Sequence, residues 1–296
     1  MPRFRSPRAQ AEHVVSKKIV LGLSRHDHKD DGQIHGLGTA RSYEQALKGT
    51  ADYIRKLKLG DLQHVSKEIA LQYLTDRSIF VSQKTLDLDR QALQVKLGER
   101  LEVIRSEKQT FLSSRSYTPA QVERITSAQS EHNSLATQIV YDTGIRAHEL
   151  LTIRPVNDRQ ASTHRVWSKD RFAGRQGEKY TVEGKGGLVR EILVSRKLTT
   201  QLEATRLKEP QEIIDRGIKY IQHFEIAGGQ AWSQSFSSAS TRELGFSNGG
   251  HGLRHAYVQQ RMEELQSSGM RYEHAKAVVA QEVGHFDPDT TEAYLR

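Results

Sequence analysis

One stretch of the sequence gathers side chains that could hold an anion. "HGLRHAYVQQR", residues 251 to 261, puts His251, Arg254 and His255 in the first turn of a predicted helix that is apolar on two sides. A buried cation is costly unless it is paired, so the pattern indicates an anion that the site is built to hold. The alternative left open at this point is Arg254 paired with a carboxylate and the histidines bonded to the backbone.

Three further segments carry residues that could join that cluster. "DTGIRAHEL" places Arg146 and Glu149 one helical turn apart, so the pattern predicts that both lie on one helix face. "EGKGG" puts Lys185 at the tip of a predicted hairpin, from which a long cationic side chain can reach into a cleft. "VGHFDPDTTEAYLR" places His285 before a turn and Tyr294 on a short terminal helix.

A metal site is the competing interpretation of the histidines. His251 and His255 have the i, i+4 spacing of a zinc pair, and His285 could supply a third ligand. "HGLRH" lacks the glutamate of the zinc-protease motif, however, and Arg254 would lie beside the ion. We therefore expect no metal and no cofactor.

The elements that must position these residues fall into three segments. Residues 1–38 are basic and then rich in His, Asp and Gly, which predicts a tail that orders only on a partner or a solvated leader without a role. Residues 39–115 have helical periodicity and predict a small all-helical unit. Residues 116–296 form the second domain, with a β-hairpin over 179–195 and helices elsewhere, one of them starting near Ile145.

Composition narrows the class of protein. The 296 residues include 44 Lys and Arg against 36 Asp and Glu, a net charge of +8 that suits a polyanionic partner. The absence of cysteine excludes disulfides and thiolate metal sites. Neither a run of about 18 apolar residues nor a secretory signal is found, so we expect a cytoplasmic protein.

Together, the motifs resemble a known family. "TGIRAHEL", "HGLRHAYVQQR" and "GHFDPDTTEAYL", in that order, are similar to the conserved boxes of the tyrosine recombinases, the phage-integrase family. The resemblance covers roughly residues 118 to 296, and "GKGG" lies between the first two boxes, where this family keeps its lysine. Residues 39–112 more loosely resemble the family's core-binding domain. The implied fold is α+β: mainly α with a small antiparallel sheet, in two domains.

The resemblance also implies a reaction and the residues that perform it. The anion would be a scissile DNA phosphate, gripped by two permanently charged guanidinium groups so that no metal is required. A tyrosine oxygen would displace the sugar and form a 3′-phosphotyrosyl intermediate. The implied roles are Tyr294 as nucleophile, Arg146 and Arg254 as phosphate ligands, His251 as proton acceptor, Lys185 as general acid, His285 as a donor to the phosphate, and Glu149 as the group that orients the cations.

The implied partners are double-stranded DNA with a specific recombination site and three further copies of the chain, which would form a tetramer in the synapse. The resemblance implies an integrase of a mobile element, associated with the nucleoid, and leaves open whether a directionality or DNA-bending protein takes part. Subunit contacts are expected from residues 209–248 or from the tail. Two alternatives remain: a DNA-binding accessory protein without catalysis, and an enzyme that relaxes DNA like a type IB topoisomerase.

Overall fold

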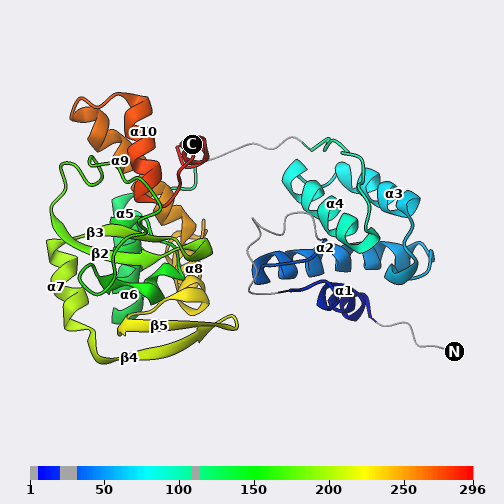
Figure 1. Ribbon diagram of the computed structural model, residues 1–296, viewed down its shortest axis with the longest axis horizontal. Helices are drawn as coiled ribbons and strands as arrows, with labels where there is room; N and C mark the ends of the chain where they lie inside the picture. Colours follow the sequence, from blue (N-terminus) through cyan, green and yellow to red (C-terminus); the bar gives the residue numbers. More distant parts are fainter. Residues whose placement is uncertain (1–5, 21–31, 109–113, 296) are drawn as a thin grey trace. The chain divides into compact units, whose positions relative to one another are not determined.

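The computed structural model describes residues 6–20, 32–108 and 114–295 (Figure 1). The chain divides into two compact units, Met1–Phe111 and Leu112–Arg296, and each has a hydrophobic core of its own. Both units are mainly helical, and the described strands form small antiparallel sheets. The predicted fold class is confirmed.

The described elements of unit 1 are all helices, apart from one isolated parallel bridge between Ile19 and Ile34. Its core is formed by apolar side chains that recur at helical spacing, such as Leu47 and Ile54 on one helix and Leu74 on the next, all of which are fully buried. The elements are α1 (Pro7–Ser16), α2 (Leu37–Lys56), η1 (Leu62–His64), α3 (Lys67–Ser78) and α4 (Gln83–Leu97).

The first helix corrects the prediction of a tail over residues 1–38. The hydroxyl of Ser6 accepts a hydrogen bond from the backbone of Ala9 and caps α1, and Pro7 follows at its first position. Ala11 and Val15 are four residues apart, so they form a short apolar stripe that is buried in the core of unit 1. A tail is therefore wrong for residues 6–20 and also for 32–38, where Ile34 is buried and α2 begins at Leu37, whereas residues 1–5 and 21–31 lie outside the described part.

Unit 2 is built around a three-stranded antiparallel sheet in the order β1-β2-β3. The predicted hairpin is present, with Glu183 opposite Val189 at its closing pair. Val182 and Ile192 lie on the buried face of the sheet, and their side chains pack against the helices in one hydrophobic core. The elements are α5 (Pro119–Ser127), α6 (Glu131–Thr143), η2 (Glu149–Thr152), β1 (Arg154–Pro155), β2 (Gly177–Glu183), η3 (Lys185–Gly187), β3 (Val189–Ser195), α7 (Arg196–Ala204), β4 (Arg206–Asp215), β5 (Ile218–Phe224), α8 (Gly229–Leu244), α9 (His251–Ser267), α10 (Tyr272–Glu282) and α11 (Asp289–Glu292).

A second hairpin interrupts the region where only helices were expected. Strands β4 and β5 pair antiparallel and form a ribbon at one edge of unit 2 (Figure 1). Its two-residue turn consists of Arg216 and Gly217, both with positive φ (51° and 78°), as a turn that matches strand twist requires. The alternating β-branched residues of "IIDRGIKYI" are a strand signal, so the expectation of uninterrupted helices after residue 197 is wrong.

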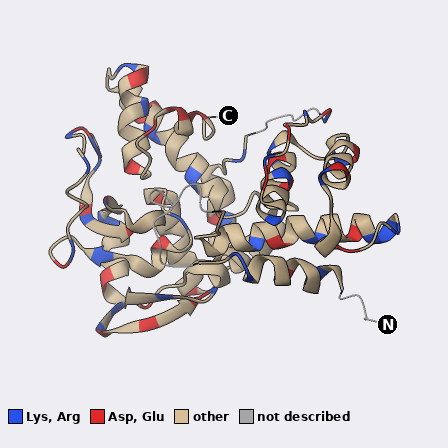
Figure 2. Ribbon diagram, turned by 45° about the vertical axis from the view of Figure 1, so that its right-hand side comes forward, with Lys and Arg blue, Asp and Glu red and all other residues tan. Residues whose placement is uncertain are grey.

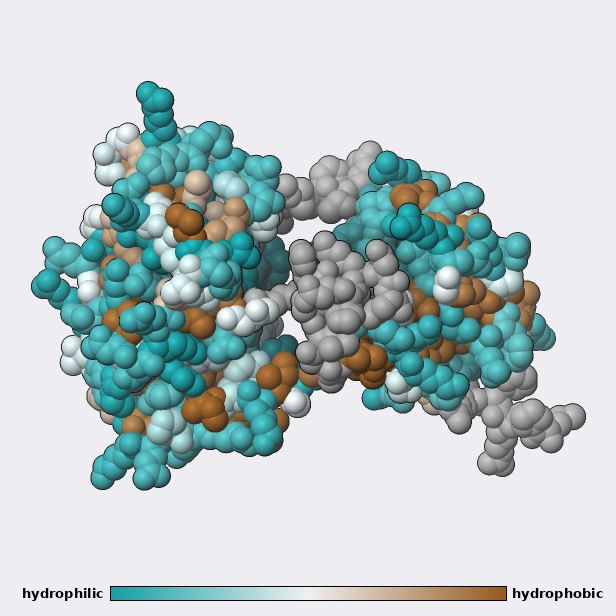
Figure 3. All heavy atoms as spheres, viewed as in Figure 1, coloured by the Kyte–Doolittle hydropathy of each residue, from teal (hydrophilic) through white to brown (hydrophobic). Residues whose placement is uncertain are grey.

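The surface mixes charges of both signs. Lys and Arg are interspersed with Asp and Glu along the ribbon of both units (Figure 2), and apolar residues occur as separate small patches on the face shown in Figure 3. Within the described ranges, no helix is long and apolar enough to cross a membrane.

Candidate active site

Arg146 is positioned by a turn rather than by a helix. Helix α6 ends at Gly144, whose φ of 65° turns the chain, so the expected helix near Ile145 is wrong. The Glu149 side chain accepts hydrogen bonds from the backbone N–H of Arg146 at 2.7 Å and from its Nη1 at 2.9 Å. Arg146 and Glu149 therefore meet as predicted, although 3₁₀ helix η2 replaces the α-helical turn that was to bring them together.

A second arginine, which the sequence reasoning missed, completes this pair. Nη1 and Nη2 of Arg190 each donate to an oxygen of Glu149 at 2.9 Å, and both side chains are fully buried. Burial alone would raise the pKa of Glu149, but the charges and hydrogen bonds of Arg190, with the charge of Arg146, hold it well below its usual value. The available signal was the alternation of strand β3, where Arg190 shares the buried face with Ile192 and Val194.

The guanidinium of Arg254 is completely buried and is bonded to backbone oxygens. Its Nη1 donates to the carbonyl of Gly144 at 2.6 Å, and its Nη2 donates to the carbonyl of Val283. Among the described residues, no carboxylate lies within ion-pair distance of it, and its Nε has no hydrogen-bond partner. Burial and the charge of Arg146 lower the pKa of Arg254 to about 9, so the group stays charged at neutral pH. The alternative of a carboxylate partner for Arg254 is therefore wrong.

His285 lies between the two predicted phosphate ligands. Its Nε2 is 3.0 Å from Nη2 of Arg146 and 3.4 Å from Nη2 of Arg254. Guanidinium nitrogens only donate, so we assign Nε2 as the acceptor and Nδ1 as the protonated nitrogen. Nδ1 is buried without a partner. Burial and the two arginine charges lower the pKa of His285 to about 4, so the ring is neutral at pH 7.

Tyr294 joins this cluster within the same chain. Its side chain is only 7% exposed, and the guanidinium carbon of Arg254 lies 5.5 Å from its ring centroid. Nε2 of Gln259 donates to the Tyr294 carbonyl at 2.9 Å and ties the end of the chain to helix α9. The His285 ring is also close, with its centroid 5.7 Å from that of Tyr294. Residues that are distant in sequence therefore surround the tyrosine.

Two more imidazoles flank the tyrosine. The centroid of His251 lies 5.4 Å from that of Tyr294, and the centroid of His255 lies 4.8 Å away. His251 is exposed at the start of α9, yet desolvation by its neighbours and the charge of Arg254 lower its pKa to about 4. His255, to which the resemblance gave no role in the reaction, is buried and its Nδ1 has no partner. The part of the chain that the structure describes has no cluster of ligands suited to a metal.

Lys185 is placed only by its backbone. It begins the short 3₁₀ turn η3 that connects β2 to β3, at the tip of the hairpin where the sequence predicted it. Its side chain lies outside the described part of the structure. Its predicted role stays a prediction.

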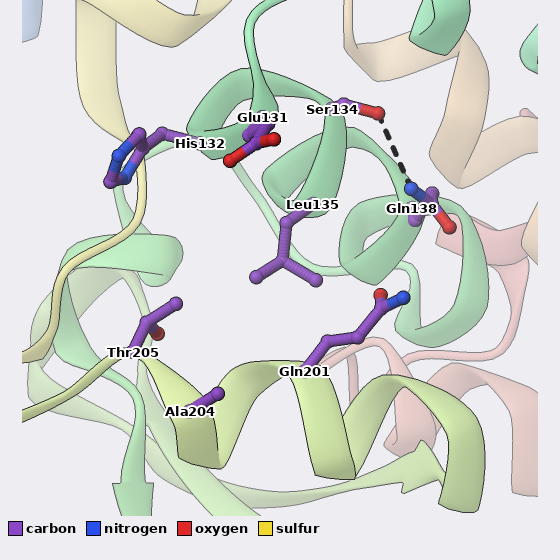
Figure 4. Close-up of a pocket in the computed structure, with 8 residues that line it drawn as sticks. All are labelled: Glu131, His132, Ser134, Leu135, Gln138, Gln201, Ala204 and Thr205. Atoms are coloured by element: carbon purple, nitrogen blue, oxygen red, sulfur yellow. Dashed lines mark hydrogen bonds between the residues drawn. The ribbon is translucent and has the colours of Figure 1, made fainter.

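A separate hollow of about 420 Å³ lies between α6 and α7 and contains none of the predicted site residues (Figure 4). Leu135 of α6 and Ala204 of α7 contribute apolar surface to it, and Ser134 and Gln138 are joined at its rim. The catalytic candidates therefore form a tight cluster in unit 2 rather than line this hollow.

Comparisons with known proteins show what this geometry is similar to. No protein-family model matches the sequence, and no curated protein matches it. The structure of XerH site-specific recombinase bound to difH in a pre-cleavage complex matches with 18% identity and a TM-score of 0.54, over 98% of this chain and 81% of that one. A lambda integrase dimer bound to a COC′ core site and a lambda integrase tetramer bound to a Holliday junction each match with 15% identity and a TM-score of 0.57, over 98% of this chain and 76% of theirs. This likeness shows that the chain has the fold of the tyrosine recombinases.

Proposed function

We propose that this chain is a site-specific DNA recombinase that cleaves and rejoins strands through a 3′-phosphotyrosyl bond to Tyr294. The observation that carries the proposal is the buried guanidinium of Arg254, which has no carboxylate partner among the described residues. It lies over the tyrosine ring and shares the Nε2 atom of His285 with Arg146. A buried cation without a counter-charge is costly, and a phosphodiester supplies that charge. The fold of the chain supports the same conclusion, since lambda integrase and XerH were crystallised on DNA.

In the proposed reaction, Arg146 and Arg254 donate to the non-bridging oxygens of the phosphate, which gain charge in the transition state. The phosphate replaces the ring nitrogen of His285 as acceptor for the arginine N–H groups. Once Nε2 no longer accepts from the arginines, the neutral ring takes the tautomer that is protonated at Nε2, and His285 donates this N–H to the phosphate. Buried Glu149 and Arg190 hold Arg146 in place, because the carboxylate binds both guanidinium groups.

The covalent step exchanges one phosphorus–oxygen bond for another. The Oη of Tyr294 attacks the phosphorus in line, the bond to the 5′ oxygen breaks, and the phosphate remains a diester. His251 is neutral in the empty site and therefore able to accept the phenol proton. The departing 5′ oxygen takes a proton from Lys185. Reversal with a different 5′ hydroxyl rejoins the strands, and no metal takes part.

The two units would have different roles on DNA, one in binding and one in catalysis. We propose residues 39–115, nearly all of which belong to unit 1, as the core-binding domain and residues 116–296, which belong to unit 2, as the catalytic domain. By likeness to the lambda integrase tetramer on a Holliday junction, the active assembly would be a homo-tetramer on two duplexes. We further propose that the chain is the integrase of a mobile element and works in the cytoplasm on the nucleoid.

The test is covalent trapping on a nicked duplex. A pool of duplexes with a randomised centre and a nick beside it loses a short fragment after cleavage, so the adduct cannot rejoin. The native chain should give a complex that survives denaturing detergent, and mass spectrometry should place the nucleotide on Tyr294. Tyr294→Phe, which lacks only the hydroxyl, should still bind duplex DNA and give no adduct.

Each outcome of the trapping experiment separates the candidate functions. An adduct formed by Tyr294→Phe would refute the nucleophile assignment. DNA binding by the native chain without any adduct would favour the accessory protein. Relaxation of a supercoiled plasmid that lacks the selected site would favour the topoisomerase-like enzyme, since a recombinase needs its site.

A further inference from the structure

The segment between β1 and β2 contains basic and aromatic residues that the proposed reaction does not use. We define loop 162–171 as the sequence "STHRVWSKDR". At its start, the backbone N–H of Ser162 donates to the carbonyl of Val189 at 2.9 Å, and the Val189 N–H donates to the Ser162 hydroxyl at 3.1 Å. Val189 begins β3 directly after the turn that contains Lys185, so the loop starts beside the hairpin tip.

The middle of the loop rests on the residue that follows His285. The Trp167 ring lies 5.0 Å from the ring of Phe286, centroid to centroid, and the guanidinium carbon of Arg165 lies 4.7 Å from the Phe286 centroid. The loop therefore runs from the hairpin tip to the turn that carries His285. Both of these elements would face the DNA in the proposed reaction.

The far end of the loop is fixed by contacts that neutralise its charge. Arg171 pairs with Glu191 at 2.9 Å and lies over the Trp167 ring, with its guanidinium carbon 4.5 Å from the centroid. The backbone N–H of Ser168 donates to Oε1 of Gln281 on α10 at 2.7 Å. These contacts hold the loop on the body of unit 2, so its exposed tip is pre-organised.

The tip itself presents a cation and an apolar side chain to solvent. Arg165 is exposed, and within the described ranges no carboxylate pairs with it. Stacking on Phe286 restricts its guanidinium, which lowers the entropy that it would lose on binding an anion. Val166 is 91% exposed, the highest value among the large exposed hydrophobic side chains of the described residues. Neither side chain contributes to the core.

We propose that loop 162–171 binds the duplex beside the scissile phosphate, with Arg165 on a neighbouring backbone phosphate and Val166 against sugar atoms in the minor groove. The inference rests on the proposed function, because the position of the loop matters only if the cluster around Arg254 holds a phosphate. An arginine that contacts phosphate fixes the position of a protein on DNA, and apolar side chains are used in the minor groove.

The first test measures how DNA binding depends on salt. A fluorescent 30-base-pair duplex of arbitrary sequence is titrated with the native chain, Arg165→Ala and Arg165→Lys between about 0.05 and 0.2 M salt. Loss of one phosphate contact should reduce the slope of log K against log salt by about 0.9 and weaken binding roughly eightfold at 0.1 M salt. Arg165→Lys should keep the native slope, because it keeps the charge.

Lys197→Ala is the matched control. Lys197 is exposed at the start of α7, beyond the end of β3 opposite the hairpin tip, and about 20 Å along the strand from it. Lys197→Ala removes the same charge as Arg165→Ala. Its slope of log K against log salt should equal that of the native chain. If Arg165→Ala and Lys197→Ala both behave like the native chain, the inference is wrong.

The second test locates the tip on DNA. Because the chain has no cysteine, Val166→Cys creates a unique thiol to which an iron chelate that cleaves nearby DNA can be attached. Strong cleavage of the duplex from position 166 and weak cleavage from Lys197→Cys is the expected result. Equal, weak cleavage from both positions would overturn the inference.

The two proposals can fail separately. A native chain that binds the duplex steeply with salt and forms the Tyr294 adduct, while Arg165→Ala is unaffected, contradicts only the loop. A native chain with neither salt-dependent binding nor an adduct contradicts the proposed function and, with it, the loop's role.

Discussion

The buried pair of Glu149 and Arg190 makes the sharpest prediction about how the site is held together. Arg190→Met keeps an unbranched side chain of similar length but leaves the fully buried Glu149 with Arg146 as its remaining hydrogen-bonded cation. Removing one partner of a buried ion pair costs about 3–5 kcal/mol. For a unit of 150–250 residues, this corresponds to a fall in Tm of about 6 to 20 °C.

The size of this loss should depend on pH. In the native chain the pKa of Glu149 is depressed, so its contribution to stability is present above the unfolded value, about 4.3, and is lost as pH falls through the folded one. In Arg190→Met, burial is opposed by less positive charge, and the pKa of Glu149 rises. Protonation then relieves the buried charge, so the destabilisation should be largest near pH 8 and smaller near pH 5.

Urea unfolding followed by tryptophan fluorescence measures this directly. The two tryptophans, Trp167 and Trp232, both belong to unit 2, so the signal reports the unit that contains the pair. Glu149→Gln combined with Arg190→Met removes the buried charge and should recover part of the loss. A change below about 1 kcal/mol, or a change that is the same at both pH values, would show that the pair does not support the site as described.

Three further predictions concern other parts of the fold. Gly144→Ala should destabilise unit 2 by more than about 1–2 kcal/mol in the same urea assay, because the φ of Gly144 is 65° and a Cβ there would lie 2.5 Å from the Tyr257 ring. Unchanged stability would contradict this close contact. Because the pKa of His285 is depressed, its contribution to stability is complete above pH 6.5 and is lost as pH falls toward 4. His285→Asn should therefore flatten the pH dependence of the free energy of unfolding. A pH profile identical to that of the native chain would argue against a neutral buried ring. Deleting residues 1–20 should lower the Tm of unit 1, measured by circular dichroism, because Ala11 and Val15 leave its core; an unchanged Tm would mean that α1 contributes no stability.

Sequence patterns predicted the local features of the site well. The glycine that ends α6, the hairpin at residues 179–195 and the first turn of α9 are each encoded within a few residues. Short-range patterns of this kind need no knowledge of the tertiary structure. The resemblance to the tyrosine recombinases, and not these patterns, implied that the residues share one site. The structure places Arg254, His251 and His285 around Tyr294, and the side chain of Lys185 lies outside the described part.

The features that were missed depend on contacts between distant segments. Arg190 is stable in a buried position because Glu149, 41 positions earlier, accepts hydrogen bonds from both of its Nη groups. The pattern of β3 indicates burial at position 190 but does not predict this carboxylate partner. Helix α1 has only a short apolar stripe in its sequence, and its buried residues, Pro7, Ala11 and Val15, are covered because α1 packs against α2. The β4–β5 ribbon is the exception, because its own sequence carries a strand signal that was overlooked.

The hydrogen bonds of Arg254 have a consequence for the stability of the site before a phosphate binds. Gly144 and Val283, whose carbonyls accept from it, are the C-cap residues of α6 and α10. Each helix end carries a partial negative charge of about one half from its aligned peptide dipoles, and such an end stabilises a nearby cation by up to about 2 kcal/mol. The backbone thus lowers the cost of burying this arginine, and no side-chain substitution can delete that contribution, while the full negative charge is left for the phosphate to supply. Lysine at position 254, with a single nitrogen, could not span both helix ends in the same way.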